Sequence, residues 1–328
     1  MLGLNETTVS IKNIIKASKN VYKYLSPTPL RHYKILSDML GCELWLKHEN
    51  HNPTCAFKVR GGINFVAQLT DEQKQAGLYT ASTGNHGQSI AYASQHFNAK
   101  AIIYVPKNAN SGKVAAMQAY GAQVVHFGDN FDQCRAAALQ AANKNNGMFI
   151  GPTDEALING VGSYGLEIIN DLPDVDLIIV PVGAGSGICG TAIVAKTINP
   201  KIKIIGVQSA QAPAQQLSWR NGELIEAQNT TIAEGVATGV PFINTQKIMR
   251  KNVDEFLLVD DKDIIKSTEI LIKNSHNLIE EASAATFAAA QQIKSQLQGK
   301  KVVLVISGGN ISMNNLGQLF GVQPRKES

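Results

Sequence analysis

Short apolar runs alternate with longer stretches of mixed polarity along most of the chain. Strands are expected at the apolar runs 78–81, 101–105, 123–127, 177–182, 202–208 and 301–306. Helices are expected at the stretches between them that are rich in Ala and Gln, at 88–97, 113–120, 133–144 and 264–274. This alternation is typical of an α/β fold in which mostly parallel sheets carry helices on both faces.

The two ends of the chain carry further helical patterns. Residues 1–21 contain polar side chains throughout, which predicts a surface helix rather than a cleaved leader. Residues 283–298 are dominated by Ala and Gln and are predicted to form one long, closely packed helix. No run approaches the ~20 apolar residues that a membrane-spanning helix requires. We therefore expect a cytoplasmic protein without a membrane anchor.

The middle of the chain contains a complete alternation of strands and helices of its own. Residues 72–150 are therefore expected to form a small domain inserted into a larger one. The larger domain would consist of residues 1–71 and 151–328. No internal repeat or low-complexity linker separates the two.

Composition narrows the class of protein. The 328 residues are 44% hydrophobic and 17% charged, with a net charge of +4, which fits a globular protein with a sizeable core. The basic residues are scattered, so we expect no nucleic-acid partner. The four cysteines are widely spaced and form no CxxC pair. This spacing argues against a disulfide framework or structural zinc and favours a reducing compartment.

Lys58 is the first candidate for chemistry. It follows a Pro-Thr turn and Phe57, and it precedes the double glycine at 61–62. Such a setting can place an amine in an apolar pocket, where it loses its charge more easily and becomes nucleophilic. The residues of this segment alone leave a purely structural lysine equally open.

A second candidate is the turn Gly183–Gly187, with the sequence Gly-Ala-Gly-Ser-Gly, directly after the expected strand at 177–182. Its near absence of side chains lets backbone N–H groups approach a phosphate, and the helix expected after it adds partial positive charge. The turn has neither the Gly-Lys-Ser/Thr of a P-loop nor the spacing of a dinucleotide site. We predict a binding site for a single phosphate, with a simple tight turn as the alternative.

Two more polar turns follow expected strands. Residues 82–86 read Ser-Thr-Gly-Asn-His and supply neutral hydrogen-bond donors that can hold a carboxylate. Their alternative role is to cap the following helix. Residues 307–310 read Ser-Gly-Gly-Asn, and the hydroxyl can pair with one heteroatom of a ligand, or the segment is a plain turn. Ligands of open α/β sheets bind at such strand ends.

In this order, the four motifs resemble those of the pyridoxal-phosphate enzymes of the tryptophan-synthase-β group, known as fold type II. The similarity is greatest to the threonine dehydratase and serine racemase branch and covers nearly the whole chain. Shorter matches are Pro-Thr-Pro-Leu at 27–30, Lys-His-Glu-Asn at 47–50, and two aspartates at 260–261. The resemblance implies a two-lobed fold of mostly parallel sheets and a site for the same cofactor, pyridoxal phosphate.

By this resemblance, Lys58 forms a Schiff base with pyridoxal phosphate and Phe57 lies beside the cofactor ring. Asn85 hydrogen-bonds the phenolic oxygen of the ring, and Ser307 meets the pyridine nitrogen. The residues that the resemblance assigns to the cofactor phosphate are Gly183, Ala184, Gly185, Ser186 and Gly187.

The resemblance also assigns the substrate site. Ser82, Thr83 and His86 bind the carboxylate of an amino acid. The implied reaction converts threonine or serine to a 2-keto acid and ammonia, with Lys58 as the base that removes the α-proton. A homodimer is implied as well. The alternatives are a serine racemase, a 3-hydroxyaspartate dehydratase, a β-replacement enzyme, and a non-catalytic ligand-binding protein on the same scaffold.

Several positions depart from the pattern of the branch. Position 83 is Thr, where racemases carry Ser as the acid/base on the opposite ring face and many dehydratases carry Ala. Thr83 is therefore a catalytic candidate for limited racemisation. The neutral Ser307, in place of an aspartate, favours an unprotonated ring and elimination.

Two further departures concern regulation. Residues 206–218 contain no Asp or Glu where metal-stimulated members place a carboxylate, so we expect no divalent metal. The chain ends at Ser328, which leaves no room for a C-terminal regulatory domain. The Glu-Pro that usually follows the late helix is replaced by two glutamates at 280–281, a change expected to be minor.

Overall fold

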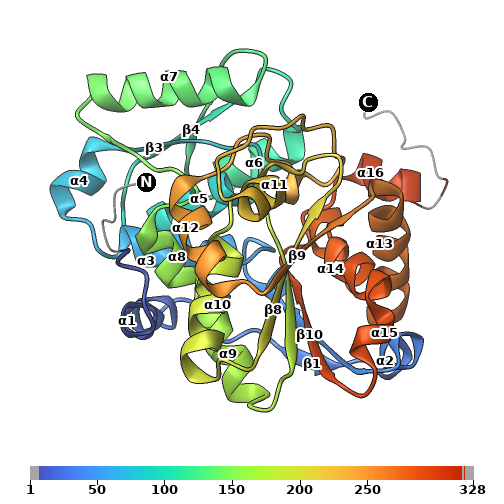
Figure 1. Ribbon diagram of the computed structural model, residues 1–328. Coiled ribbons are helices and arrows are strands. Elements are labelled where there is room, and N and C mark those ends of the chain that lie inside the picture. The colour runs from blue at the N-terminus through green and yellow to red at the C-terminus, as the bar shows by residue number, and fades with distance from the viewer. Residues whose placement is uncertain (1–6, 320, 322–328) are drawn as a thin grey trace.

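The structure, a computed structural model, describes residues 7–319 and 321. A six-stranded sheet forms the centre of the larger part of the molecule (Figure 1). Its order is β1-β2-β10-β7-β8-β9, and all neighbouring pairs are parallel except β1 with β2. The strands are β1 (Leu30–His32), β2 (Glu43–His48), β10 (Lys301–Ile306), β7 (Leu177–Pro181), β8 (Lys203–Ser209) and β9 (Glu255–Val259).

Helices cover both faces of this sheet, as the burial of its central strands requires. On β7, Leu177 and Ile179 join the core beneath one face, while Ile178 and Val180 join the core beneath the other. This split follows from the two-residue period of a strand. The first face is covered by α2 (Lys34–Leu40), α13 (Asp261–Ser275), α14 (Glu281–Gln292) and α15 (Lys294–Leu297). The second is covered by α1 (Ile11–Val21), α8 (Glu155–Val161), α9 (Ser163–Asp171), α10 (Ser186–Ile198) and α12 (Ile243–Asn252).

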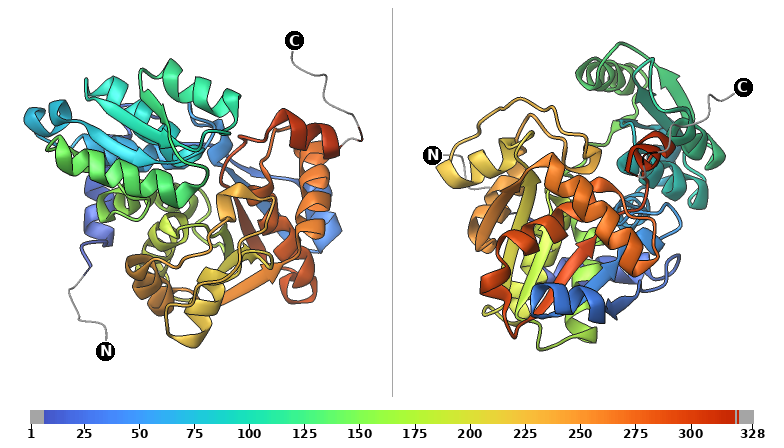
Figure 2. Two further views of the ribbon diagram at one scale, coloured as in Figure 1. Left: turned by 90° about the horizontal axis from the view of Figure 1, so that it is seen from above. Right: turned by 90° about the vertical axis from the view of Figure 1, so that its right-hand side faces the viewer.

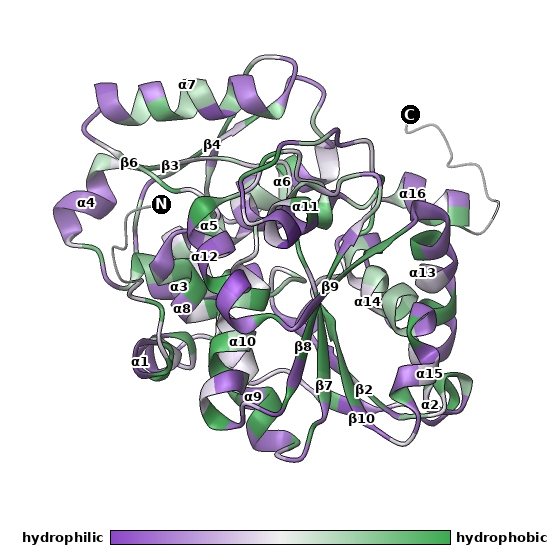
Figure 3. Ribbon diagram, in the orientation of Figure 1, coloured by the Kyte–Doolittle hydropathy of each residue, from purple (hydrophilic) through white to green (hydrophobic). Residues whose placement is uncertain are grey.

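Hydropathy follows the same layers. In Figure 3 the central strand β7 is largely hydrophobic, whereas α1, α4 and α7 carry much hydrophilic colour. The remaining segments of the larger part are α11 (Ala214–Asn221), α16 (Met313–Leu319) and the short 3₁₀ helices Glu49–His51 and Glu234–Val236. Within the described residues, no helix is long and apolar enough to cross a membrane.

A second sheet has four parallel strands in the order β5-β4-β3-β6. These strands are β5 (Gln123–His126), β4 (Ala101–Val105), β3 (Leu78–Ala81) and β6 (Met148–Phe149). Its helices are α3 (Lys58–Val66), α4 (Asp71–Ala76), α5 (Asn85–His96), α6 (Ser111–Ala119) and α7 (Phe131–Lys144). The core on one face is built mainly by α3, α5 and α6, and α7 packs on the other.

The two sheets belong to two bodies that lie side by side. Figure 2 shows the segment around residues 75–145, in cyan to green, set apart from the yellow-to-red part of the chain. The core of the four-stranded sheet also includes Val59, Ile63 and Val66 of α3, which lie outside 72–150. Helix α3 therefore links the two bodies. The division into domains at 71/72 and 150/151 stays a prediction.

The α/β fold and the expected strands are confirmed. Three strands have the expected bounds, β5 and β7 each end one residue earlier than expected, and β8 is shifted by one residue at both ends. Helix α5 begins at Asn85, three residues earlier than expected, so Asn85 and His86 lie in its first turn. The N-terminal surface helix is confirmed from Ile11 onward, while residues 1–6 lie outside the described part of the chain.

The prediction of one long helix over 283–298 is wrong. The structure has α14, which ends at Gln292, and a separate short α15 from Lys294. Between them Ile293 takes φ −105° and ψ 21°, outside the helical region. Its β-branched side chain is disfavoured in helices and is buried here in the core. Tertiary packing of this one residue outweighs the helical tendency of its Ala-rich neighbours.

Candidate active site

A cavity of about 680 Å³ lies where strand ends of both sheets meet. The turn at 82–86 follows β3 of the smaller sheet, and the turns at 183–187 and 307–310 follow β7 and β10 of the larger one. Every site residue singled out in the sequence lines this cavity: Phe57, Lys58, Ser82, Thr83, Asn85, His86, Gly183, Ala184, Gly185, Ser186, Gly187 and Ser307. The fold therefore brings four distant motifs to one place.

Lys58 is the first residue of α3, and its half-buried side chain lies in the cavity wall. Its Nζ donates to the Ser186 hydroxyl at 2.7 Å and lies 5.1 Å from the centre of the Phe57 ring. Burial lowers the pKa of the Lys58 amine to about 8. The neutral, nucleophilic form is thus accessible near physiological pH.

The segment before Lys58 is held by the turn that follows β10. The Phe57 N–H donates to the Ser307 carbonyl at 3.0 Å, and the Gly309 N–H donates to the Cys55 carbonyl at 2.9 Å. Cys55 has a positive φ of 52°, which bends the chain toward this turn. These contacts fix the position of Lys58 relative to Ser307, although 249 residues separate them in sequence.

The turn at 183–187 has no room for side chains. A Cβ on Gly183 would lie 2.3 Å from the Gly235 carbonyl oxygen, and one on Gly187 would lie 3.1 Å from the Tyr164 hydroxyl. Gly185 has a φ of 99°, a region that other residues rarely adopt. Helix α10 starts at Ser186, so its first N–H groups face the turn. A shallow, positively polarised cradle of this kind fits a phosphate group.

The turn at 82–86 does not cap α5 through a side chain. Gly84 is the cap residue, and the Ser82 hydroxyl instead accepts from the Gly84 N–H at 3.2 Å. The capping interpretation of this motif is therefore wrong. The first N–H groups of α5 are available at the cavity, because a helix start leaves such donors unpaired within the helix.

His86 is buried, and burial together with the charge of Lys58 lowers its pKa to about 4. The imidazole is neutral near pH 7. Its Nε2 lies 3.2 Å from the Ile150 carbonyl oxygen, and since a carbonyl only accepts, Nε2 carries the proton. The ring then has no second proton to donate, so His86 serves a carboxylate better through its backbone N–H than through its side chain.

Ser307 directly follows β10, and its hydroxyl lies 3.0 Å from that of Ser283 on α14. The Ser283 hydroxyl also accepts from the Gly308 N–H at 2.9 Å. Sequence reasoning missed Ser283, because nothing in an Ala-rich helix marks one serine as a partner of a strand end 24 residues later.

Glu280 is the other residue that the sequence did not single out. It lines the cavity, is 7% exposed, and accepts from the Asn85 Nδ2 at 3.1 and 3.2 Å. The Oδ1 of Asn85 accepts from the Asn310 Nδ2 at 2.8 Å. The only signal in the sequence is the pair of glutamates at 280–281, which stands where the branch has Glu-Pro. That replacement is predicted to be minor and does not by itself point to a contact with Asn85.

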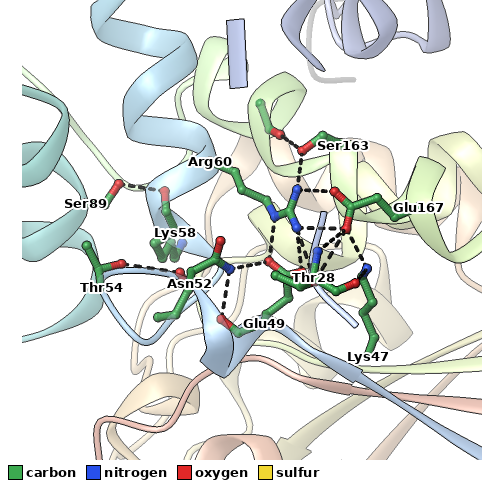
Figure 4. Close-up of polar contacts among 12 residues, drawn as sticks. Thr28, Lys47, Glu49, Asn52, Thr54, Lys58, Arg60, Ser89, Ser163 and Glu167 are labelled. Atoms are coloured by element: carbon green, nitrogen blue, oxygen red, sulfur yellow. Dashed lines mark hydrogen bonds and ion pairs between the residues drawn. The ribbon is translucent and has the colours of Figure 1, made fainter. Parts of the chain in front are cut away.

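A buried ion cluster lies behind the lysine segment (Figure 4). Arg60 donates to Glu49 at 2.7 Å and to Glu167 at 2.6 Å, and Lys47 donates to Glu167 at 2.5 Å. Two positive and two negative side chains balance the charge, as burial requires. The cluster ties α3 to β2 and α9, two elements of the larger body. Lys58 stands two residues before Arg60 on the same helix.

Within residues 7–319 and 321, no three His, Cys, Asp or Glu side chains converge as a metal site. At the segment 206–218, the Gln208 amide donates to the Val236 carbonyl at 3.4 Å. The expected lack of a divalent metal stays a prediction.

Comparison with known proteins places these features in a family. The family described as "Pyridoxal-phosphate dependent enzyme" matches residues 21–308. The chain is 36% identical to an L-threonine ammonia-lyase of Thermotoga maritima, over 95% of this chain and 78% of that protein. It is 32% identical to an L-threo-3-hydroxyaspartate ammonia-lyase of Saccharomyces cerevisiae, over 94% and 95%.

The fold is also similar to that of a solved relative. The structure of a serine racemase from Dictyostelium discoideum superposes with a TM-score of 0.87 and 34% identity, over 93% of this chain and 100% of that one. The fold type II architecture expected from the four motifs is thereby confirmed.

Proposed function

The chain belongs to the family of pyridoxal-phosphate-dependent enzymes, and from this premise we propose that it is a threonine or serine ammonia-lyase. The observation that carries the proposal is the meeting of Lys58, the glycine turn and Ser307 in one cavity. The relatives named as L-threonine ammonia-lyases support the choice of reaction.

The residues present fit the cofactor. The half-buried Lys58 amine supplies the attachment point, and the turn at 183–187, whose glycines have no room for a Cβ, supplies a cradle of backbone N–H groups for the phosphate. Asn85 and Ser307 would pair with the phenolic oxygen and the pyridine nitrogen of the ring. When bound, pyridoxal phosphate supplies an electron sink that makes the α-proton of an attached amino acid acidic.

Lys58 is the base in this proposal. Its amine takes the α-proton and then delivers a proton toward the departing β-hydroxyl group. The pKa of about 8 suits both tasks, because the amine gains and loses a proton near neutral pH. Ser186 holds the amine by accepting its hydrogen bond at 2.7 Å.

Ser307 shapes which reaction follows. Its hydroxyl carries no charge, and Ser283 holds it in place at 3.0 Å. An uncharged partner does not force a proton onto the pyridine nitrogen, which favours elimination over transamination. Replacing Ser307 with Asp should raise side reactions at the expense of keto-acid release, measured as the ratio of the two products.

The substrate carboxylate is proposed to lie at the start of α5. The N–H groups there, together with the hydroxyls of Ser82 and Thr83, supply neutral donors near the helix dipole. The Thr83 hydroxyl is also the proposed acid/base on the second ring face. Its methyl group crowds that side, so we expect racemisation to be the slower reaction.

One observation favours 3-hydroxyaspartate as the alternative substrate. Arg135 of α7 lines the cavity, and a guanidinium group binds a carboxylate through two parallel hydrogen bonds. The side-chain carboxylate of 3-hydroxyaspartate would pair with the guanidinium group of Arg135. Replacing Arg135 with Ala should then abolish turnover of 3-hydroxyaspartate and leave threonine turnover nearly unchanged.

A substrate panel tests the proposal. The holoenzyme is given L-threonine, L-serine and L-threo-3-hydroxyaspartate, and both keto acid and the chirality of the remaining amino acid are measured. We expect keto acid from threonine or serine. Chiral inversion without keto acid would identify a racemase instead. The matched control, Lys58→Ala, should lose both products and the absorbance of the attached cofactor.

We also infer a homodimer in the cytoplasm. The support for the homodimer is the family resemblance alone. The support for the compartment is the set of four cysteines, none of which is disulfide-bonded in the described residues. Light scattering of the purified protein should give twice the monomer mass of 35.2 kDa.

A further inference from the structure

Glu280 is a buried carboxyl group in the cavity wall that the proposed reaction leaves unused. We propose that Glu280 is a positioning residue that orients the Asn85 amide toward the phenolic oxygen of the bound cofactor, and that its protonation state changes that contact. This inference rests on the proposed cofactor site but not on which substrate the enzyme uses.

The hydrogen bonds leave the Asn85 amide only one orientation. Asn310 Nδ2 donates to the Thr54 carbonyl at 2.9 Å, and a carbonyl only accepts, so this nitrogen is correctly assigned. The same nitrogen donates to Asn85 Oδ1 at 2.8 Å. The Nδ2 of Asn85 must then face Glu280, which accepts at 3.1 and 3.2 Å. One N–H of this NH₂ group is used by the carboxylate, and the other has the cavity within reach.

The carboxylate itself has little freedom to move. A Cβ on Gly308 would lie 2.6 Å from Oε1 of Glu280, and one on Gly235 would lie 3.5 Å from the same atom. The Glu280 N–H donates to the Gly308 carbonyl at 3.1 Å. Two glycines therefore make room for the carboxyl group and hold it against Asn85.

The surroundings of Glu280 shift the pKa of its carboxyl group toward neutral pH. Burial raises the pKa of its carboxyl group to about 7, the Asn85 hydrogen bond and the charge of Lys113 oppose the rise, and the charge of Glu281 adds to it. The thiol of Cys55 also faces it from the lysine segment. Lys113 of α6 is itself paired with Glu234 at 2.5 Å.

Ionised Glu280 would hold Asn85 with a charge-assisted hydrogen bond, whereas the neutral acid holds it more weakly. Its negative charge also stands one amide group away from the phenolic oxygen and disfavours ionisation of that oxygen. Both effects reach the cofactor through Asn85, which makes Glu280 a positioning residue and not a catalytic one.

The test measures cofactor affinity and cofactor absorbance from pH 5.5 to 9 in apoenzyme reconstituted with pyridoxal phosphate. We expect the bound absorbance of the wild type to change with a midpoint near 7. Glu280→Gln keeps the volume and an acceptor oxygen but has no charge, so this change should vanish. Its dissociation constant above pH 8 should rise about tenfold, the usual scale of one charge-assisted hydrogen bond.

The matched control is Glu281→Gln. Glu281 lines the same cavity at the start of α14 but accepts from Asn315, at 2.7 Å, and not from Asn85. This variant should keep the wild-type affinity and a pH-dependent change of absorbance, with a midpoint somewhat below that of the wild type, because the charge of Glu281 that raises the pKa of Glu280 is removed. Equal behaviour of the two variants, or a midpoint that persists in Glu280→Gln, would overturn the inference.

Glu280→Asp covers the case in which the Gln variant does not fold. Aspartate keeps the charge but shortens the reach to Asn85, so affinity should fall while a pH-dependent change of absorbance remains. Wild-type affinity in Glu280→Asp would count against the positioning role. Neither readout depends on turnover, so a failed substrate panel leaves this test intact.

Discussion

At the scale of single residues, burial favours the neutral form of two groups that line the cavity. It lowers the pKa of the Lys58 amine to about 8 and raises that of the Glu280 carboxyl group to about 7. Both groups can therefore exchange protons near neutral pH, the property expected of ionisable groups at functional sites. His86, with a pKa lowered to about 4, stays neutral throughout that range.

The lowered pKa of Lys58 predicts how the rate of pyridoxal-phosphate attachment depends on pH. Only the neutral amine attacks an aldehyde, so the rate should rise about tenfold per pH unit up to pH 7 and level off above the pKa of about 8. Stopped-flow absorbance of apoenzyme mixed with pyridoxal phosphate measures this rate. Glu280→Gln serves as the control that removes the other group titrating in this range. A rate that does not change with pH would contradict the lowered pKa of the Lys58 amine.

Substitutions of two glycines that both have positive φ should separate the cost of backbone strain from an effect on cofactor binding. Gly185→Ala should lower the free energy of unfolding by more than about 1 kcal/mol, because φ is positive there and a Cβ would lie 2.8 Å from that of Thr245, and it should also weaken cofactor binding. Gly222→Ala is the matched control, since Gly222 has a φ of 80° and open space around its Cβ position. It should lose about 1 kcal/mol, from its positive φ alone, with unchanged cofactor affinity. Calorimetry and absorbance titration give the two values.

At the scale of elements, helix α3, which begins at Lys58, lies between the two bodies. Its apolar side chains Val59, Ile63 and Val66 join the core of the smaller sheet. Its Arg60 is tied to Glu49 and Glu167 in the larger body. The same helix therefore carries Lys58 and the contacts that place it between the two strand ends.

Removal of Arg60 tests this anchor. Arg60→Met leaves two buried carboxylates with a single lysine, so the free energy of unfolding should fall by about 3–5 kcal/mol. The exposed pair Lys34–Asp38 is the control, and Lys34→Met should cost less than about 1 kcal/mol. Urea denaturation measures both. A small loss in Arg60→Met would mean that the cluster does not anchor α3.

At the scale of the whole molecule, the cavity exists because two separately built sheets present their strand ends to each other. Its lining comes from α3 and from turns after β3, β7 and β10. A ligand held there contacts both bodies at once. Ligand binding and global stability should accordingly be coupled.

Pyridoxal phosphate should therefore stabilise the folded chain by mass action. At one hundred times the dissociation constant the expected gain is about 2.7 kcal/mol, and Tm should keep rising with cofactor concentration. Differential scanning calorimetry of apoenzyme at several cofactor concentrations measures the effect. Lys58→Ala should reduce the gain strongly, whereas a Tm independent of cofactor would argue against the site.

Sequence alone determined the fold class and predicted a set of site residues, all of which line one cavity. Apolar runs identify β3, β4 and β10 with their observed bounds, since strands covered on both faces carry few polar residues. The four motifs identify the lysine, the phosphate turn and the polar turns, because their chemistry depends on residue type and local spacing. The long helix at 283–298 was wrong, since a local pattern does not register the packing of Ile293.

Only the tertiary structure decided how these residues act together. The shifted pKa of Lys58, the Ser283–Ser307 contact and the clamp of Asn85 by Glu280 all join segments far apart in the chain. Desolvation and hydrogen-bond geometry arise when such segments pack, so no local pattern contains them. Glu280, which the sequence marks only as one of two adjacent acids, gains its role from the three-dimensional contacts around it.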